Sequence, residues 1–502
     1  MKTTYHFLYI AALAIVTAGC NKQLNTAPSN AVAEDIVLKS VSNLSTVSEG
    51  SWASLMDDFY GGTYGNPGFK TIALVSDAMG NDVAVNPVKY SFNPVYTFNQ
   101  LNDKTQSRVN AIWNQLYKII NNQNIILANV DKVEGDAGAK RILKGQALAQ
   151  RAHLYLTIAS FYQFSYLKDP NAKTAPVYTV PSSDKTVGNP KATLNDIYTQ
   201  IFKDLDDAIP LLKGYQRNAK YKIDTNVVFG LQARAYLNTG RWNEAATAAA
   251  KALKYFPLMS QADYTQGFND VRNSEWIWGH PEIPSQSDGS YSFHFLDVSS
   301  AASYYYSFNA DPFFKEFFNE GDIRKTLFSW DGRSGRLGFL QYRKFRFRDD
   351  LTADLVLMRS AEAWLIKAEG LARADKLAEA AQALNELRTA RGATPVDAAT
   401  ISKENLIREI LIERRKELWG EGFSLSDIIR NQLSVERKPY VDASNKPIVV
   451  EVTTPDGTVL QVPSKSHTST RFPDGKAYTP NSPYYLFAIP LSEEQNNPNL
   501  NK

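Results

Sequence analysis

The residues that could carry out catalysis or bind a metal are scattered along this sequence. The five histidines are His6, His153, His280, His294 and His467. No His-Glu-x-x-His pair is present, and a single cysteine cannot form the paired Cys/His spacing of a zinc site. The Gly-x-Ser-x-Gly elbow of hydrolases and the Gly-x4-Gly-Lys phosphate loop are also missing. We therefore predict no catalytic residue, no metal site and no cofactor.

Carboxylates leave one enzymatic alternative open, because glycoside hydrolysis needs only two acidic groups brought together in space. The adjacent pairs Asp57-Asp58 and Asp349-Asp350 fit loop or cap positions better than a catalytic pair. Asp77 and Asp82 could offer oxygen ligands to calcium, but their spacing does not match an EF-hand loop. We favour binding over catalysis.

Cys20 is the one residue whose setting predicts a specific reaction. It follows Thr17-Ala18-Gly19 and an apolar run that is too short to span a bilayer. Lipoprotein processing cuts before such a cysteine and acylates its sulfur. We predict a signal peptide over residues 1–19, a lipidated leash over 20–31 and one domain over 32–502.

Composition restricts the partners of this domain. The 55 basic and 52 acidic residues give a net charge of +3, so no strong field attracts nucleic acid. With one cysteine the chain has no internal disulfides, so an apolar core must hold it together. Aromatic residues make up 12%, which fits both a core and a sugar-stacking surface.

Helical repeats form the scaffold that must position any binding residues. From Phe229 to Pro257, small and aromatic residues fall at the positions that tetratricopeptide repeats use, with Gly240 between the helices. Similar periodicity indicates repeat helices at about 108–166, 193–257 and 354–430. We predict a mainly α fold, a tetratricopeptide-like superhelix of about four helix pairs.

Three irregular segments interrupt the repeats, at about 55–105, 260–350 and 432–485. Their aromatic content argues against disorder, so together they should form a loop-rich lobe with short strands. Ile448–Val452 and Thr458–Val462 flank Pro455-Asp456-Gly457, which predicts a hairpin. Trp276 and Trp278 alternate on a predicted strand, so one should face the core and the other outward.

Several of these motifs, taken in order, resemble the SusD/RagB family of outer-membrane nutrient-binding lipoproteins. The resemblance covers nearly the whole predicted mature chain. It rests on these segments: Trp113-Asn114-Gln115-Leu116-Tyr117 with Ile120 and Asn124; Ser274–Gly279; Met358–Ala363; Glu413–Leu418 with Glu421-Gly422; and Ile489-Pro490 with Asn497–Leu500.

We interpret the charged residues of the motif Glu413–Leu418 with Glu421-Gly422 as structural. Arginine forks suit bidentate pairing with carboxylates, and a charge run on a helix is usually paired or solvated. The alternative is a site for an acidic ligand. The predicted structural cluster comprises Glu413, Arg414, Arg415, Glu417, Glu421, Asp427 and Arg430.

The family resemblance implies a function. It implies a lid-like protein at the cell surface that captures oligosaccharides and delivers them to a SusC-like TonB-dependent transporter. It also implies that the irregular segments, rather than the repeats, build the ligand face. The candidates are Asn81, Asp82, Tyr90, Asn93 and Tyr96 in the first segment, and Tyr304, Tyr305, Tyr306 and Trp330 in the second.

Two alternatives remain. A RagB-like member of the same family would capture peptides instead of sugars. A tetratricopeptide-repeat lipoprotein could be a scaffold for outer-membrane assembly, although such a scaffold would not need the long aromatic insertions.

Overall fold

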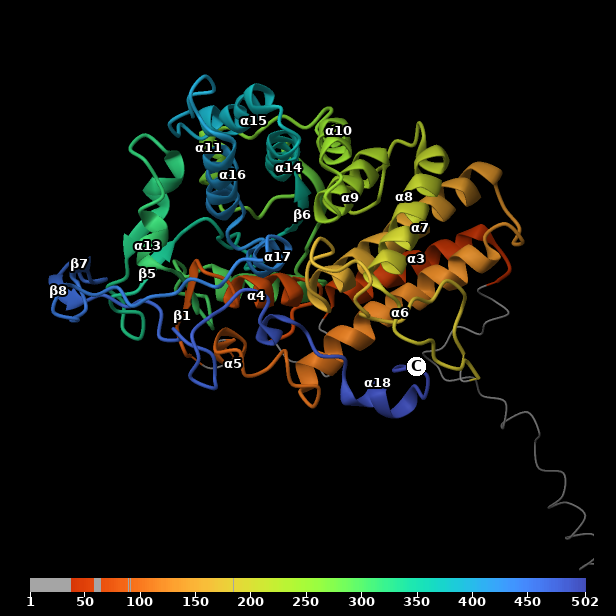
Figure 1. The fold of residues 1–502 in the computed structure, drawn as a ribbon, viewed down its shortest axis with the longest axis horizontal. Coiled ribbons are helices and arrows are strands. Elements are labelled where there is room, and N and C mark those ends of the chain that lie inside the picture. The colour runs from red at the N-terminus through yellow and green to blue at the C-terminus, as the bar shows by residue number, and fades with distance from the viewer. Residues whose placement is uncertain (1–37, 58–64, 89, 91, 184) are drawn as a thin grey trace, which may run out of the picture.

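The protein was analysed as a computed structural model, which describes residues 38–57, 65–88, 90, 92–183 and 185–502. The described chain is mainly α-helical, as predicted, and its helices stack side by side into an arc (Figure 1). Among the described residues, no helix combines the length and apolar character that a bilayer span requires. Cys20 and the rest of the predicted leader lie outside the described residues.

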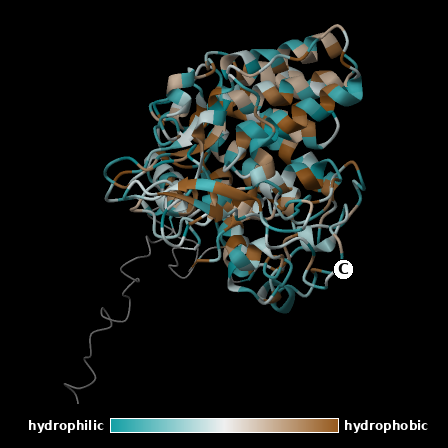
Figure 2. Cartoon of the chain, turned by 90° about the vertical axis from the view of Figure 1, so that its left-hand side faces the viewer, coloured by the Kyte–Doolittle hydropathy of each residue, from teal (hydrophilic) through white to brown (hydrophobic). Residues whose placement is uncertain are grey.

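The arc is built from antiparallel helices, some joined by short turns and others by long irregular segments. Figure 2 shows these helices banded with hydrophilic and hydrophobic stretches, as expected for amphipathic helices packed against one another. In chain order they are α3 (Val41–Met56), α6 (Ser107–Asn129), α7 (Ala137–Phe161), α8 (Leu194–Leu212), α9 (Thr225–Asn238), α10 (Trp242–Ala252), α14 (Ser360–Arg373), α15 (Leu377–Ala390), α16 (Lys403–Leu418) and α17 (Ser424–Arg430).

Local sequence explains where these helices begin, turn and approach one another. Thr193 and Asp196 form a capping box at the start of α8. Gly240 adopts φ +74° in the turn between α9 and α10, a conformation that favours glycine. Gly370 lets α14 approach α10 closely, since a Cβ there would lie 2.6 Å from the Trp242 carbonyl oxygen.

The lobe at one end of the arc contains a four-stranded sheet in the order β1-β3-β5-β4. Its strands are β1 (Val83–Val85), β3 (Phe308–Ala310), β4 (Phe328–Trp330) and β5 (Leu340–Tyr342). The same stretches of the chain also form short helices: α4 (Lys70–Ala78), α5 (Asn93–Tyr96), α11 (Gln261–Tyr264), α12 (Phe293–Leu296) and α13 (Pro312–Lys315), with the 3-10 turns η1 (Asp288–Ser292) and η2 (Ile323–Leu327). All these strands and turns come from the first two of the irregular segments.

Two further strand pairs complete the molecule. The predicted hairpin is confirmed as β7 (Val449–Thr453) paired antiparallel with β8 (Val459–Pro463), which projects from the lobe (Figure 1). The turn η3 (Pro483–Tyr485) and helix α18 (Leu491–Asn496) follow and bring the chain back beneath α6.

The other pair, β2 (Trp276–His280) with β6 (Leu355–Arg359), corrects two expectations. Trp276 and Trp278 are both fully buried, because residues two apart on a strand share a face; Ile277 between them is buried too, so β2 is covered on both faces. Leu355–Arg359, expected to open a helix, is instead a strand that leads into α14.

Candidate functional site

Two exposed tyrosines from different segments lie close together on the lobe. Tyr304 is 62% exposed and Tyr90 is 46% exposed, and the buried ring of Tyr305 lies between them. Tyr305 contacts Tyr90 edge to face at 5.4 Å between ring centroids, and its ring lies 6.1 Å from that of Tyr304. We call Tyr90, Tyr304, Tyr305 and His294 the tyrosine platform.

His294, at α12, supports the platform from beneath. Its ring stacks on Tyr304 at 4.4 Å with an interplanar angle of 16°, and its Nδ1 accepts a hydrogen bond from the Tyr304 amide at 3.2 Å. Burial lowers the pKa of His294 to about 4, so the ring is neutral at physiological pH and Nδ1 can accept this bond. One face of Tyr304 is thereby fixed while the other remains open.

The chain before Tyr304 is held by side-chain hydrogen bonds. Arg336 donates to the carbonyl oxygens of Val298 (2.9 Å) and Ser300 (3.0 Å), and Asp297 accepts from the amides of Ser299 and Ser300. Tyr90 holds φ +61°, which is unfavourable for a residue with a side chain and persists only where the surroundings enforce it. The segment that carries Tyr304 is therefore held in place, which lowers the entropy lost on binding.

The two other candidates of the second irregular segment, Tyr306 and Trp330, are not part of the tyrosine platform. Tyr306 is half-buried under the Arg336 guanidinium, which lies 3.7 Å from its ring centroid. Trp330, at the end of β4, lies near Tyr440 at 6.4 Å between centroids. The structure thus brings together Tyr90, Tyr304 and Tyr305, and places Trp330 in a different aromatic group.

Three of the five first-segment candidates make internal contacts. Tyr96 is fully buried, and its hydroxyl bonds to Nδ1 of His467 at 3.0 Å, so its ring has no face to offer a ligand here. Asn81 accepts a hydrogen bond from the Glu436 amide, and Asp82 pairs with Arg415 at 2.6 Å.

Asn81 and Asp82 also line an apolar groove of about 560 Å³ beside α16 and α17. Asn93 opens α5 and is half-buried.

Sequence reasoning missed His294, which was regarded only as one of five scattered histidines. The signal was local: Tyr291 and His294 stand three residues apart, and their rings lie 5.3 Å apart. It also missed Tyr440 beside Trp330, because no pattern links positions 110 residues apart along the chain.

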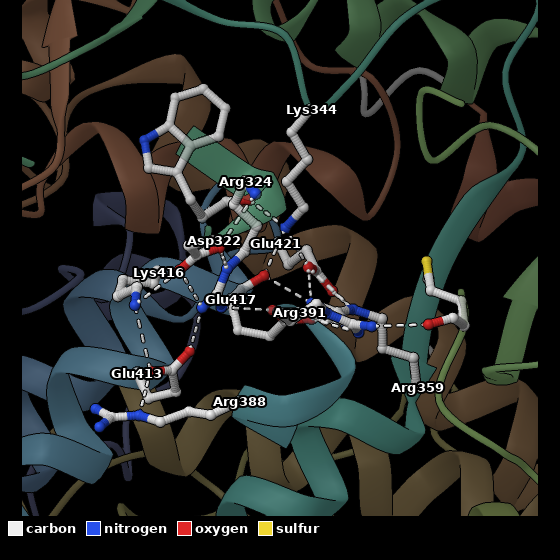
Figure 3. A network of polar contacts seen from close by, with 12 residues as sticks. Asp322, Arg324, Lys344, Arg359, Arg388, Arg391, Glu413, Lys416, Glu417 and Glu421 are labelled. Atoms are coloured by element: carbon white, nitrogen blue, oxygen red, sulfur yellow. Dashed lines mark hydrogen bonds and ion pairs between the residues drawn. The ribbon is translucent and has the colours of Figure 1, made fainter. Parts of the chain in front are cut away.

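A buried ion-pair network centres on Glu417 of α16 (Figure 3). The Glu417 carboxylate accepts from Arg324 at 2.8 Å, Arg359 at 2.7 Å and Arg391 at 2.8 Å, and all four side chains are fully buried. Glu275 balances the arginines, pairing with Arg359 at 2.6 Å and Arg391 at 2.8 Å. These contacts join η2, β6, α15 and the start of β2 to one helix.

The remaining charges of the predicted cluster extend this network. Burial alone would raise the pKa of Glu413 and Glu421, but neighbouring cations, chiefly Arg324 for Glu413 and Arg359 for Glu421, lower both to about 2. Arg414 and Arg430 both pair with Asp427, at 2.8 and 2.9 Å. These charges therefore have internal partners, as the structural interpretation requires, although Arg414, Arg415 and Asp427 also line the groove beside α16 and α17.

Comparisons with known proteins agree with this architecture. A family described as "SusD family" matches residues 341–502, and one described as "Starch-binding associating with outer membrane" matches residues 38–237. A solved SusD-like carbohydrate binding protein from Bacteroides vulgatus is 40% identical, with a TM-score of 0.86 over 92% of this chain and 98% of that one.

Two further proteins are similar to this chain. A SusD superfamily protein from Bacteroides thetaiotaomicron shares the fold at 21% identity, with a TM-score of 0.73 over 92% of this chain and 99% of its own. SusD-like protein P38 of Formosa agariphila is 36% identical over 90 residues, 16% of this chain and only 18% of that protein. From the two family matches and the 40% identical structure, we conclude that the chain belongs to the SusD/RagB family.

Proposed function

We propose that this protein is a non-catalytic receptor that captures oligosaccharides on the tyrosine platform and passes them to a TonB-dependent transporter. The observation that carries the proposal is the open face of Tyr304, held flat by the neutral His294 ring. The apolar face of a sugar ring stacks on an exposed aromatic ring of this kind, while its hydroxyls remain free for polar contacts. The relatives described above as carbohydrate binding or starch-binding support the same ligand class.

The predicted leader and the helical repeats would set how the receptor is anchored and which side faces the transporter. Lipid on Cys20 would anchor the protein to the outer membrane, where the family described as associating with that membrane acts. The helical arc would then face the transporter and leave the lobe open to the ligand. Delivery to the transporter rests on the family resemblance.

Titration calorimetry with plant, host and microbial oligosaccharides tests the platform. We expect one glycan class to bind and Tyr304→Ala to weaken it at least tenfold, or about 1.4 kcal/mol. Tyr304 is mostly exposed, so the free energy of unfolding should change by less than about 0.5 kcal/mol.

Tyr255→Ala is the matched control, because Tyr255 is 78% exposed but lies in the repeats. Equal affinity of the Tyr304 variant and the wild type would contradict the platform. Binding of peptides with no response to any glycan would favour a peptide-capturing receptor.

A further inference from the structure

A second cavity lies on the helical arc, away from the tyrosine platform. Helix α6, the segment 176–182 and helix α18 enclose about 360 Å³. This volume lies in the range of small-molecule sites, whose lower end is about 300 Å³. Two of the motifs found in the sequence meet here: Trp113–Tyr117 with Asn124 on α6, and the closing segment that begins in α18.

Hydrogen bonds from α6 fix the wall of this cavity. Asn124 Nδ2 donates to the carbonyl oxygens of Tyr178 (3.1 Å) and Val180 (3.0 Å). Asn121 Oδ1 accepts from the Ser182 amide at 2.7 Å, and the Tyr117 hydroxyl donates to the Pro176 carbonyl at 2.7 Å. The 176–182 segment is therefore held along its whole length.

The closing segment of the chain braces the same wall from the other side. Asn497 donates to the Asn189 carbonyl and Asn499 to the Gly188 carbonyl, each at 2.9 Å. The Asn189 amide in turn donates to the Tyr178 hydroxyl at 3.0 Å, which orients the Tyr178 ring. Asn497 also donates to Glu493 at 2.9 Å and so fixes a carboxylate at the cavity.

Several polar groups at the cavity keep hydrogen-bonding capacity for a ligand. Within the described residues, the Asn114 side-chain amide makes no hydrogen bond, and Asn121 uses only its oxygen. Glu493 offers a carboxylate, and Lys118 provides one cation at the rim. The opposite charges of Glu493 and Lys118 balance, so the cavity does not favour a net-charged ligand.

We infer that this cavity binds one neutral monosaccharide unit. The half-buried rings of Tyr117 and Tyr178 lie 5.9 Å apart and present apolar surface for the face of a pyranose. The Asn114 amide, the Asn121 amide nitrogen and the Glu493 carboxylate then bond to its hydroxyls. This site is separate from the tyrosine platform and does not depend on it.

Saturation-transfer NMR of the protein with D-glucose, D-galactose, D-mannose and N-acetyl-D-glucosamine tests the inference. We expect at least one sugar to bind the wild type and the Tyr304→Ala variant equally. Asn114→Leu should abolish this signal, because leucine removes both hydrogen-bonding groups and fills the cavity. Glu493→Gln should weaken binding about tenfold, because a charge-assisted bond becomes a neutral one.

Asn243→Leu is the matched control, an exposed asparagine on α10 that should bind as the wild type does. If Asn114→Leu lowers the melting temperature, the Glu493→Gln variant is used to judge the inference instead. The glutamine side-chain oxygen can still accept the hydrogen bond from Asn497, so this variant should keep the fold. Silence of all four sugars with the wild type would overturn the inference. Signals unchanged in both cavity variants, or lost in Tyr304→Ala, would do the same.

Discussion

At the residue scale, Glu417 is the side chain whose loss should cost the most. Three guanidinium groups share its carboxylate, and none of the four side chains is exposed. Glu417→Ala leaves buried positive charge uncompensated, so we expect the free energy of unfolding to fall by about 3–5 kcal/mol. Urea denaturation followed by circular dichroism measures this change.

Glu386→Ala provides the comparison, because Glu386 is exposed on the neighbouring helix α15. It should change the free energy of unfolding by less than about 0.5 kcal/mol. A Glu417 variant as stable as the Glu386 variant would mean that the network contributes little.

His294 ties ligand binding to pH in a specific way. Its Nδ1 accepts the Tyr304 amide proton only while the ring is neutral, and burial lowers its pKa to about 4. Glycan affinity should therefore stay constant from pH 8 to pH 5 and fall only as the pH drops toward about 4. Calorimetric titrations across this range measure it, and a loss of affinity centred near pH 6.5, the ordinary value for histidine, would contradict this role.

At the element scale, the contact between α10 and α14 depends on a missing side chain. A Cβ on Gly370 would lie 2.6 Å from the Trp242 carbonyl oxygen and 3.1 Å from the Ala246 nitrogen. Gly370→Ala should force the helices apart and cost about 1–3 kcal/mol, although alanine is the better helix former.

Gly50→Ala in α3 is the matched substitution, because nothing lies within 4 Å of its Cβ position. There the helix propensity should act alone and stabilise by up to about 1 kcal/mol. Thermal melting of both variants compares the two signs, and a shift in the same direction for both would contradict the close-packing argument.

The elements that sequence predicted well are those with a regular apolar stripe. Helices α6, α7 and α8 each show such spacing, and the capping box at Thr193 marks the start of α8. Helix α3 was missed because Ser48 and Ser51 occupy buried positions on its inner face, so no apolar stripe appears. The outward tryptophan predicted on β2 was wrong because residues two apart on a strand share a face, and both faces of β2 are covered.

The site was harder to predict than the scaffold, because aromatic side chains serve both core and surface. Tyr96 and Tyr304 look alike in sequence, yet the first is fully buried and the second is 62% exposed. The contact of Tyr90 with Tyr305 joins segments more than 200 residues apart, and no local pattern encodes it. Composition predicted which segments build the lobe, but it could not predict which aromatic rings face outward.

At the scale of the whole molecule, two sets of buried carboxyl groups have opposite effects on stability as the pH changes. Cations lower the pKa of Glu369, Glu413 and Glu421 to about 2, in each case against the effect of burial. Burial raises the pKa of Asp77 to about 7, and burial together with the charge of Asp82 raises that of Asp311 to about 8. The folded state favours the charged form of the three glutamates and the protonated form of the two aspartates.

Together with three buried histidines, these opposite shifts predict a maximum of stability near pH 6.5. For Asp77 and Asp311 the folded pKa exceeds the ordinary value of 3.8, so their stabilisation is lost as the pH rises toward 8. For the three glutamates the folded pKa is below the ordinary 4.5, so their stabilisation is lost as the pH falls from 4.5 toward 2. Burial also lowers the pKa of His153, His294 and His467 to about 3 or 4, so these residues cost stability as the pH falls below their ordinary value of 6.5. The free energy of unfolding should therefore rise from pH 8 to about pH 6.5, decline below that pH and collapse below about pH 4.

Urea midpoints measured at intervals from pH 8 to pH 3 test this profile, and Asp311→Asn separates its two sides. Asparagine cannot ionise, so the variant should lose much of the slope above pH 6.5 while still unfolding in acid. A wild-type profile that stays flat below pH 4.5 would show that the buried glutamates are not held charged by their arginines. An unchanged alkaline slope in the variant would assign that slope to Asp77, the other buried aspartate whose pKa is raised to near neutrality.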